Sequence, residues 1–236
     1  MDIKICFWGM LLSGGIGAFC VAATPAPEES KVDPQVRAYL ADRAAEFDQI
    51  TQERKTQLEE LAMFVKSRVE VGEPARLTFI CTHNSRRSQM AQVWAAAAAK
   101  YYGVNGVETF SGGTEATAFN PRTVAALKRA ELKIEKVERS QNPHFAVSYQ
   151  ETGDPLNCFS KVYNESPNPE TDFCAVMTCS QADKSCPLVK GSALRLAIPY
   201  EDPKVADDTP QEAEAYDTRC QQICREMLYV MSKVAG

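Results

Sequence analysis

The order of short apolar runs along the chain constrains its fold more than any other feature of the sequence. These runs alternate with segments of helical periodicity. The expected strands are residues 75–80 with Cys81 at their end, 107–110, 173–178 and 194–198, and the expected helices are residues 88–102, 121–132 and 209–234. Short buried strands that alternate with helices form a parallel sheet covered on both faces. The sequence therefore predicts an α/β fold, and such sheets bind ligands beyond the carboxyl ends of their strands.

Two segments of the chain lie outside this alternation. Residues 33–72 carry apolar residues at helical spacing, with Asp33 placed as a cap and Pro34 in the first turn. We expect them to form a helical extension that packs on the α/β domain of residues 75–236 or makes a dimer contact. Residues 139–171 are polar and contain several prolines, and we expect them to run over the surface as a long excursion.

The N-terminal stretch has the pattern of an export signal. A short start with Lys4 precedes an apolar run over residues 5–23, which ends in small residues. This pattern is typical of a cleaved signal peptide. We expect residues 1–23 to be removed, residues 24–32 to form a linker, and the protein to be exported to the periplasm. The run is also long enough to span a bilayer, and an uncleaved membrane anchor is the alternative.

The composition excludes several functional classes. The net charge of −5 argues against a nucleic-acid binder, because phosphate backbones are bound by basic surfaces. Two histidines are too few for a His-rich zinc site and argue against a Ser-His-Asp triad. Nine cysteines suggest thiol chemistry, and seven of them remain when Cys6 and Cys20 leave with residues 1–23.

One segment has a spacing that suits oxyanion chemistry. Cys81 ends the first expected strand, and five residues separate it from Arg87, which is followed by Ser88 and a helix. Five residues can turn successive backbone N–H groups toward one point, which makes an anion-binding nest at a helix N-terminus. Arg87 would close the nest with a bidentate guanidinium. The positive field favours Cys81 as a thiolate nucleophile, and Ser88 is placed to hydrogen-bond its sulfur.

A C-x5-R spacing also arises by chance, and the alternative is a buried cysteine before a loop with two surface arginines. The strand before the loop and the helix after it favour the nest, and Asn84 tolerates the left-handed backbone that a tight loop needs. The residues expected to contact the oxyanion are Thr82, His83, Asn84, Ser85, Arg86, Arg87 and Ser88.

Two ordered motifs give this chain a family resemblance. The first is Phe79-Ile80-Cys81-Thr82-x-Asn84-Ser85-x-Arg87-Ser88-Gln89-Met90-Ala91, and the second is Phe110-Ser111-Gly112-Gly113-Thr114-Glu115 followed by Asn120-Pro121. Over residues 76–231 the sequence resembles the low-molecular-weight protein tyrosine phosphatase superfamily, and within it the thioredoxin-coupled arsenate reductases. The resemblance implies a doubly wound, four-stranded parallel sheet with the substrate on the loop after the first strand. His83 and Arg86 depart from the family pattern, and Arg86 should favour a highly charged oxyanion.

The resemblance also points to a proton donor. A thiolate that attacks phosphorus or arsenic needs a proton for the departing oxygen. Asp202-Pro203 follows the fourth expected strand and resembles the Asp-Pro motif of the family, which makes Asp202 the general acid. A simple Asp-Pro turn is the alternative. Lys204-Val205 follows where the tyrosine phosphatases carry tyrosines, and this difference counts against phosphotyrosine as the substrate.

Cys179 and Cys186 follow the third expected strand and resemble the mobile redox segment of the arsenate reductases. The resemblance implies a relay, in which Cys81 forms an arsenic adduct, Cys179 attacks Cys81 and Cys186 attacks Cys179. The resulting disulfide would pass to an external dithiol such as a thioredoxin. The alternative is a static disulfide, which suits an exported protein. We expect no metal site, because neither a C-x-x-C pair nor a nearby histidine completes one.

These observations favour an enzyme that reduces arsenate to arsenite, with Cys81, Arg87, Asp202, Cys179 and Cys186 as its catalytic residues. It would need no tightly bound cofactor. Its partners would be a small oxyanion and a thioredoxin-like reductant, without nucleic acid, and with a membrane only if residues 1–23 are retained. One alternative is a phosphatase that works through a phosphocysteine. Another is a non-enzymatic oxyanion-binding or redox-sensing module.

Overall fold

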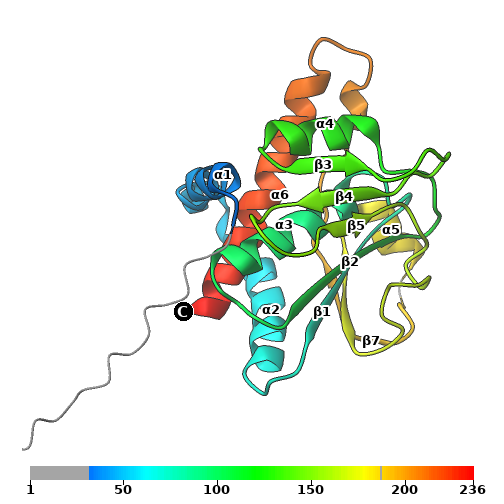
Figure 1. The fold of residues 1–236 in the computed structure, drawn as a ribbon. Coiled ribbons are helices and arrows are strands. Elements are labelled where there is room, and N and C mark those ends of the chain that lie inside the picture. Colours follow the sequence, from blue (N-terminus) through cyan, green and yellow to red (C-terminus); the bar gives the residue numbers. More distant parts are fainter. Residues whose placement is uncertain (1–31, 187) are drawn as a thin grey trace, which may run out of the picture.

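The computed structural model describes residues 32–186 and 188–236, and its centre is a parallel sheet of four strands in the order β2-β1-β6-β7 (Figure 1). The strands are β1 (Ala75–Cys81), β2 (Val107–Gly113), β6 (Phe173–Met177) and β7 (Ser192–Ala197). The predicted α/β fold with a four-stranded parallel sheet is confirmed. The expected signal peptide, 1–23, and most of the linker lie outside the described residues. No described helix is both long and apolar enough to cross a bilayer.

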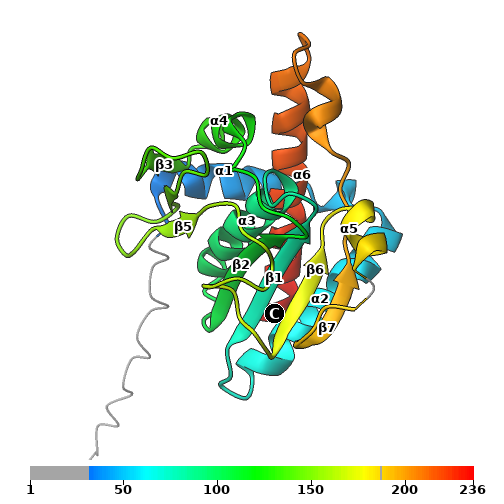
Figure 2. The same ribbon diagram turned by 90° about the vertical axis from the view of Figure 1, so that its right-hand side faces the viewer.

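The described helices surround this sheet on its two faces, some by direct contact and others through a neighbouring helix. They are α1 (Pro34–Ala44), α2 (Gln52–Val69), α3 (Arg87–Tyr101), α4 (Pro121–Arg129), α5 (Ser180–Ser185) and α6 (Glu212–Ala235), with short 3-10 turns at Phe47–Gln49 and Pro203–Ala206. Helices α2 and α3 lie against one face, and the long α6 packs across both of them (Figure 2). Helix α5 contacts β1 and β6.

Alternation along the strands divides the buried side chains between the two faces. On β1, Leu77 and Phe79 join the large core formed with the helices, whereas Ile80 joins a smaller cluster with Phe173, Met177 and the α5 residues. Both sets are almost fully buried. Neither face of such a strand is exposed to solvent, so neither needs polar side chains, and these strands therefore appear in the sequence as continuous apolar runs.

The N-terminal extension forms two helices where the sequence pattern suggested one continuous helical segment. Asp33 caps α1 as expected, because its Oδ1 accepts a hydrogen bond from the Gln35 N–H at 3.0 Å. The chain then breaks and restarts at Thr51, whose hydroxyl accepts from the Arg54 N–H. Helix α2 lies against α6, β1 and β7, and its Leu58 is fully buried in the same core as the sheet. The extension therefore completes the helical layer.

The prediction of a surface excursion over 139–171 is wrong in part. This segment contains β4 (Phe145–Ser148) and β5 (Leu156–Cys158), which join β3 (Lys133–Lys136) in an antiparallel sheet of order β3-β4-β5. Strands of three or four residues are too short for a two-residue period to stand out between prolines. Beyond β5, Ser160 and Lys161 are buried. The segment therefore runs inward, toward the loop after β1.

Candidate active site

Cys81 lies at the point where the connections of the parallel sheet diverge. Strand β1 pairs with β2 on one side and with β6 on the other, so the chain leaves β1 in one direction and returns on its opposite side. Open α/β sheets form their ligand sites at such a switch point, beyond the carboxyl ends of the strands. Helix α3 begins at Arg87, and its N-cap side chain makes no capping hydrogen bond. The first N–H groups of α3 therefore lack that partner at the end of the Cys81 loop.

A short chain of hydrogen bonds holds the Cys81 sulfur. Its Sγ lies 3.1 Å from the Ser88 Oγ, and the Asn84 Nδ2 donates to the same oxygen at 2.9 Å. Because the Ser88 oxygen already accepts from Asn84, its own hydrogen is available to donate to the sulfur. Asn84 has a φ of +46°, as the sequence predicted for a left-handed position. The arrangement places a hydroxyl donor beside the Cys81 sulfur.

The segment after β5 supports the loop from the side, and sequence reasoning missed it. The Lys161 N–H donates to the Asn84 Oδ1 at 3.0 Å, and the Ser160 hydroxyl donates to the His83 carbonyl at 2.9 Å. Burial lowers the pKa of Lys161 to about 8, because it disfavours the charged ammonium group. Nothing in this polar, proline-containing stretch of sequence distinguishes a supporting segment from an exposed one.

The end of β2 explains why the second motif carries glycine. A Cβ atom on Gly113 would collide with the Glu115 carbonyl and would lie 2.7 Å from the Thr82 oxygen. The residue at this position must therefore lack a side chain so that β2 can approach the loop. Ser85, also in the loop, donates its hydroxyl to the Ala118 carbonyl at 2.6 Å, which ties the loop to the segment before α4.

Both arginines of the loop are bound to Asp202 in this structure. The Arg87 Nη2 donates to Asp202 Oδ2 at 2.8 Å, and the Arg86 Nε donates to Oδ1 at 2.8 Å. The Arg87 Nη1 also donates to the Tyr200 carbonyl at 3.0 Å. Burial acts to raise the pKa of Asp202, but the charges of Arg87 and Arg86 outweigh it and hold that pKa below its usual value. The fold thus brings the predicted acid to the predicted oxyanion loop.

Cys179 reaches the same loop from β6. Its Sγ lies 3.5 Å from the Thr82 Oγ1 and accepts a hydrogen bond from the Ala182 N–H at 3.3 Å, at the start of α5. Its side chain is buried. Cys186 directly follows α5 and is half-buried, and its carbonyl accepts from the Arg195 Nε. None of the described cysteines forms a disulfide. The structure therefore brings Cys179 beside the residue that follows Cys81, with Cys186 at the far end of a six-residue helix.

The rim of the site carries a further pair of ionisable groups. The His83 Nε2 lies 2.8 Å from the Glu115 Oε1, and both side chains are exposed. His83 therefore lies at the exposed rim of the site, bound to Glu115. Among residues 32–186 and 188–236, no group of three or more His, Cys, Asp or Glu side chains could hold a metal ion.

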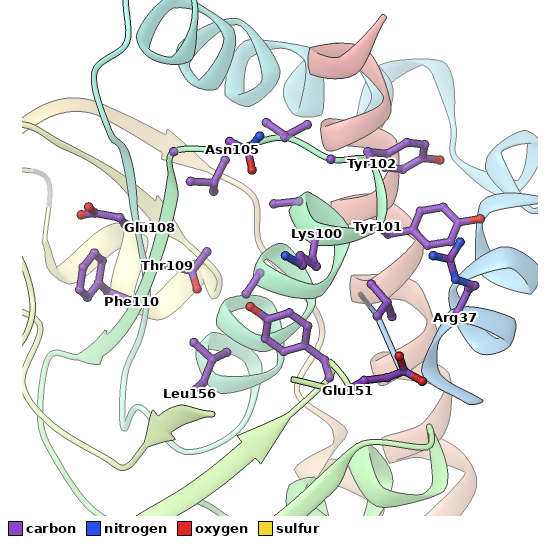
Figure 3. A pocket seen from close by; sticks show the side chains of 18 of the residues that line it. Arg37, Lys100, Tyr101, Tyr102, Asn105, Glu108, Thr109, Phe110, Glu151 and Leu156 are labelled. Carbon is purple, nitrogen blue, oxygen red and sulfur yellow. The ribbon is translucent and has the colours of Figure 1, made fainter. Parts of the chain in front are cut away.

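A cavity of about 1280 Å³ lies at the opposite end of β2 (Figure 3). Lys100 and Tyr101 extend into it from the end of α3, and Thr109 lines it from β2 (Figure 3). Because Ala75 is paired with Val107 and Cys81 with Gly113, the two ends of this strand pair are roughly 20 Å apart at 3.3 Å per residue. The cavity is therefore distinct from the Cys81 site.

These features define a class of protein, namely a parallel α/β fold with a loop from a cysteine to an arginine at its switch point. The model of the low molecular weight phosphotyrosine protein phosphatase family matches residues 76–149. The chain is 33% identical over 125 residues to an arsenate reductase of Brevibacillus brevis, covering 53% of this chain and 74% of that one. It is 30% identical over 141 residues to an arsenate reductase of Bacillus subtilis, with 60% and 83% covered.

The chain belongs to the low-molecular-weight phosphotyrosine protein phosphatase family, and it is an enzyme of that family. A solved structure described as an arsenate reductase in the oxidised state is 17% identical, covers 68% of this chain and 98% of its own, and has a TM-score of 0.43.

Proposed function

We propose that the protein reduces arsenate to arsenite through a relay of Cys81, Cys179 and Cys186. The observation that carries this proposal is the position of Cys179, whose sulfur lies 3.5 Å from the hydroxyl of Thr82 in the oxyanion loop. Hydrolysis of a phosphate ester through Cys81 needs no second thiol there. The relatives named arsenate reductase support the proposed reduction of arsenate.

In the first step, arsenate binds to the loop N–H groups and takes the Arg87 guanidinium from Asp202. The Cys81 thiolate attacks arsenic, so that an S–As bond forms and an As–O bond breaks. The departing oxygen leaves as water with a proton from Asp202. The positive end of α3 and Arg87 stabilise the charge that builds on the remaining oxygens.

In the second step, the thiolate of Cys179 attacks the sulfur of Cys81. An S–S bond forms, the S–As bond breaks, and its electron pair stays on arsenic, which leaves as arsenite in the +3 state. The Cys186 thiolate then attacks the sulfur of Cys179 and releases the Cys81 thiolate. An external dithiol, itself oxidised to a disulfide, reduces the Cys179–Cys186 disulfide. Cys186 lies across α5 from Cys179, so this short helix has to rearrange during the relay.

Alanine variants of the two relay cysteines test this proposal. We expect Cys179→Ala to form the Cys81 adduct once without releasing arsenite, and Cys186→Ala to stop after one turnover. Arsenite release with an added dithiol would be measured in single- and multiple-turnover assays. Cys224→Ala is the matched control, because Cys224 is buried in α6 away from the loop. Full turnover by either relay variant would rule out the relay.

The second candidate function is a phosphatase that uses a phosphocysteine at Cys81. The match to the phosphatase family model favours it, and Cys81, Arg87 and Asp202 suffice for its chemistry. Water would then hydrolyse the S–P bond, and both relay variants would keep full activity on an aryl phosphate. Cys81→Ser should abolish reductase and phosphatase turnover alike. Retention of either activity in that variant would rule out Cys81 as its nucleophile, and absence of both activities in the unmodified protein would leave the non-enzymatic binding module.

A further inference from the structure

The carboxylate of Asp202 accepts more hydrogen bonds than a protonated carboxylic acid could accept. Its Oδ1 accepts from the Arg86 Nε at 2.8 Å and from the Lys204 N–H at 3.1 Å. Its Oδ2 accepts from the Arg87 Nη2 at 2.8 Å and from the Arg86 Nη2 at 3.3 Å. A proton on either oxygen would have to replace one of these donors. In the free protein, therefore, both oxygens are held in the ionised form.

Binding of an oxyanion separates the roles of the two arginines. Arg87 starts helix α3 and is the cation that the nest needs, so an anion there competes with Asp202 for it. Arg86 keeps its close contact with Oδ1, where the Lys204 N–H also donates. Oδ2 is then left with the long contact to Arg86, at 3.3 Å. The oxygen that becomes free for a proton is thus the one that faced Arg87.

Other charged and titratable groups surround this carboxylate. From α6, Tyr216 and Arg219 face the site, and the Tyr216 hydroxyl donates to Asp207 at 2.8 Å. Glu201 precedes Asp202 in the chain and interacts with Arg219. Arg86 is distinct among these groups because it binds Asp202 through two atoms and its side chain is only 11% exposed.

We propose that Arg86 is a positioning residue for Asp202, which anchors Oδ1 at the rim and leaves Oδ2 to carry the proton to the departing group. The proposal rests on the first step of the proposed function, which the phosphatase reaction shares. In this proposal, Arg86 holds the general acid Asp202 and does not bind the oxyanion. Removing Arg86 should therefore change how Asp202 titrates, while the affinity for the anion changes little.

The direct experiment is a carbon NMR titration of the full chain with labelled aspartate carboxyl groups, in which the Asp202 signal is identified by its loss in Asp202→Asn. In Arg86→Ser, we expect the Asp202 titration to move to higher pH by about one unit. Burial acts to raise the pKa of this carboxyl, and in the variant only Arg87 of the two arginines remains to lower it. Arg129→Ser is the matched control, since Arg129 forms an ion pair with Asp217 on α6, outside the site. Arg86→Lys keeps the positive charge but cannot donate through two nitrogens as the guanidinium does, so it should give a smaller shift. It replaces the serine variant in this experiment if Arg86→Ser does not fold.

Kinetics with phenyl phosphate and binding of inorganic phosphate supply the second readout. In Arg86→Ser, the fall of kcat at alkaline pH should move upward with the Asp202 titration, while KM and the phosphate Kd stay within about twofold. An unchanged Asp202 titration together with a tenfold weaker phosphate Kd would overturn the proposal and make Arg86 an oxyanion ligand. If the titration shifts but arsenate is never reduced, the role of Arg86 stands and the proposed reductase function fails.

Discussion

At the scale of single residues, the site depends on a few hydrogen bonds that hold the Cys81 sulfur and the Asp202 carboxylate in place. Ser88 accepts from Asn84 and so presents its hydrogen to the Cys81 sulfur. The pattern of residues around Cys81 predicted this contact, because cysteine, loop and serine are adjacent in the chain. It did not predict the partners of Arg86, which was expected to serve the oxyanion and is bound to Asp202 in the structure.

Replacing Ser88 by alanine tests the hydrogen bond to sulfur. We expect Ser88→Ala to lower the rate at which iodoacetamide alkylates Cys81 at neutral pH by about tenfold, because a hydrogen bond to a charged group contributes about 1.5–3 kcal/mol. Ser232→Ala is the control, since its hydroxyl donates to the Tyr229 carbonyl at the end of α6. Equal alkylation rates in the wild type and Ser88→Ala would show that Ser88 does not stabilise the thiolate.

At the scale of elements, the helices before β1 are part of the layer that covers the sheet. Helix α2 packs on α6, β1 and β7, and Leu58 and Leu61 on it are fully buried. The apolar spacing predicted helices here but could not choose between a packing surface and a dimer contact, because both bury the same stripe of side chains. In contrast, β4 and β5 were missed, since strands this short show no periodicity.

A pair of substitutions on α2 tests its part in the core. We expect Leu58→Ala to lower the free energy of unfolding by about 2–5 kcal/mol, as for other buried leucines. Met63→Ala, on the exposed side of the same helix, should stay within about 0.5 kcal/mol of the wild type. Urea unfolding followed by circular dichroism measures both. A small loss for Leu58→Ala would indicate that α2 adds little to the fold.

At the scale of the whole molecule, the proposed reaction requires a reductant in the compartment where the protein resides. The N-terminal pattern predicts export, and a cytosolic thioredoxin cannot reach an exported protein. A relay disulfide that forms in an oxidising compartment would also stay oxidised unless a dithiol is supplied there. We therefore propose that a thioredoxin-like protein on the exported side reduces Cys179–Cys186.

Mass spectrometry of the protein isolated from its source tests export and redox state together. We expect the mature chain to start at Thr24, since the predicted signal peptide ends at Ala23. We also expect Cys179 and Cys186 to be joined in the fraction not treated with reductant, and to become alkylated after a brief dithiol treatment. A retained Met1 would contradict cleavage of a signal peptide after Ala23 and would leave the uncleaved anchor. A disulfide that resists the dithiol in the folded protein would contradict the relay.

The sequence by itself determined the four strands of the central sheet, the helices after β1 and β2 and at the C-terminus, and the Cys81–Arg87 loop with its left-handed Asn84, because each depends on residues that are neighbours along the chain. Only the tertiary structure decided which distant groups meet at that loop. Thr82 meets Cys179 from 97 positions away, Asn84 meets the Lys161 amide from 77, and Arg86 meets Asp202 from 116. Such contacts follow from the order of strands in the sheet and the course of the connections between them, which local periodicity does not encode.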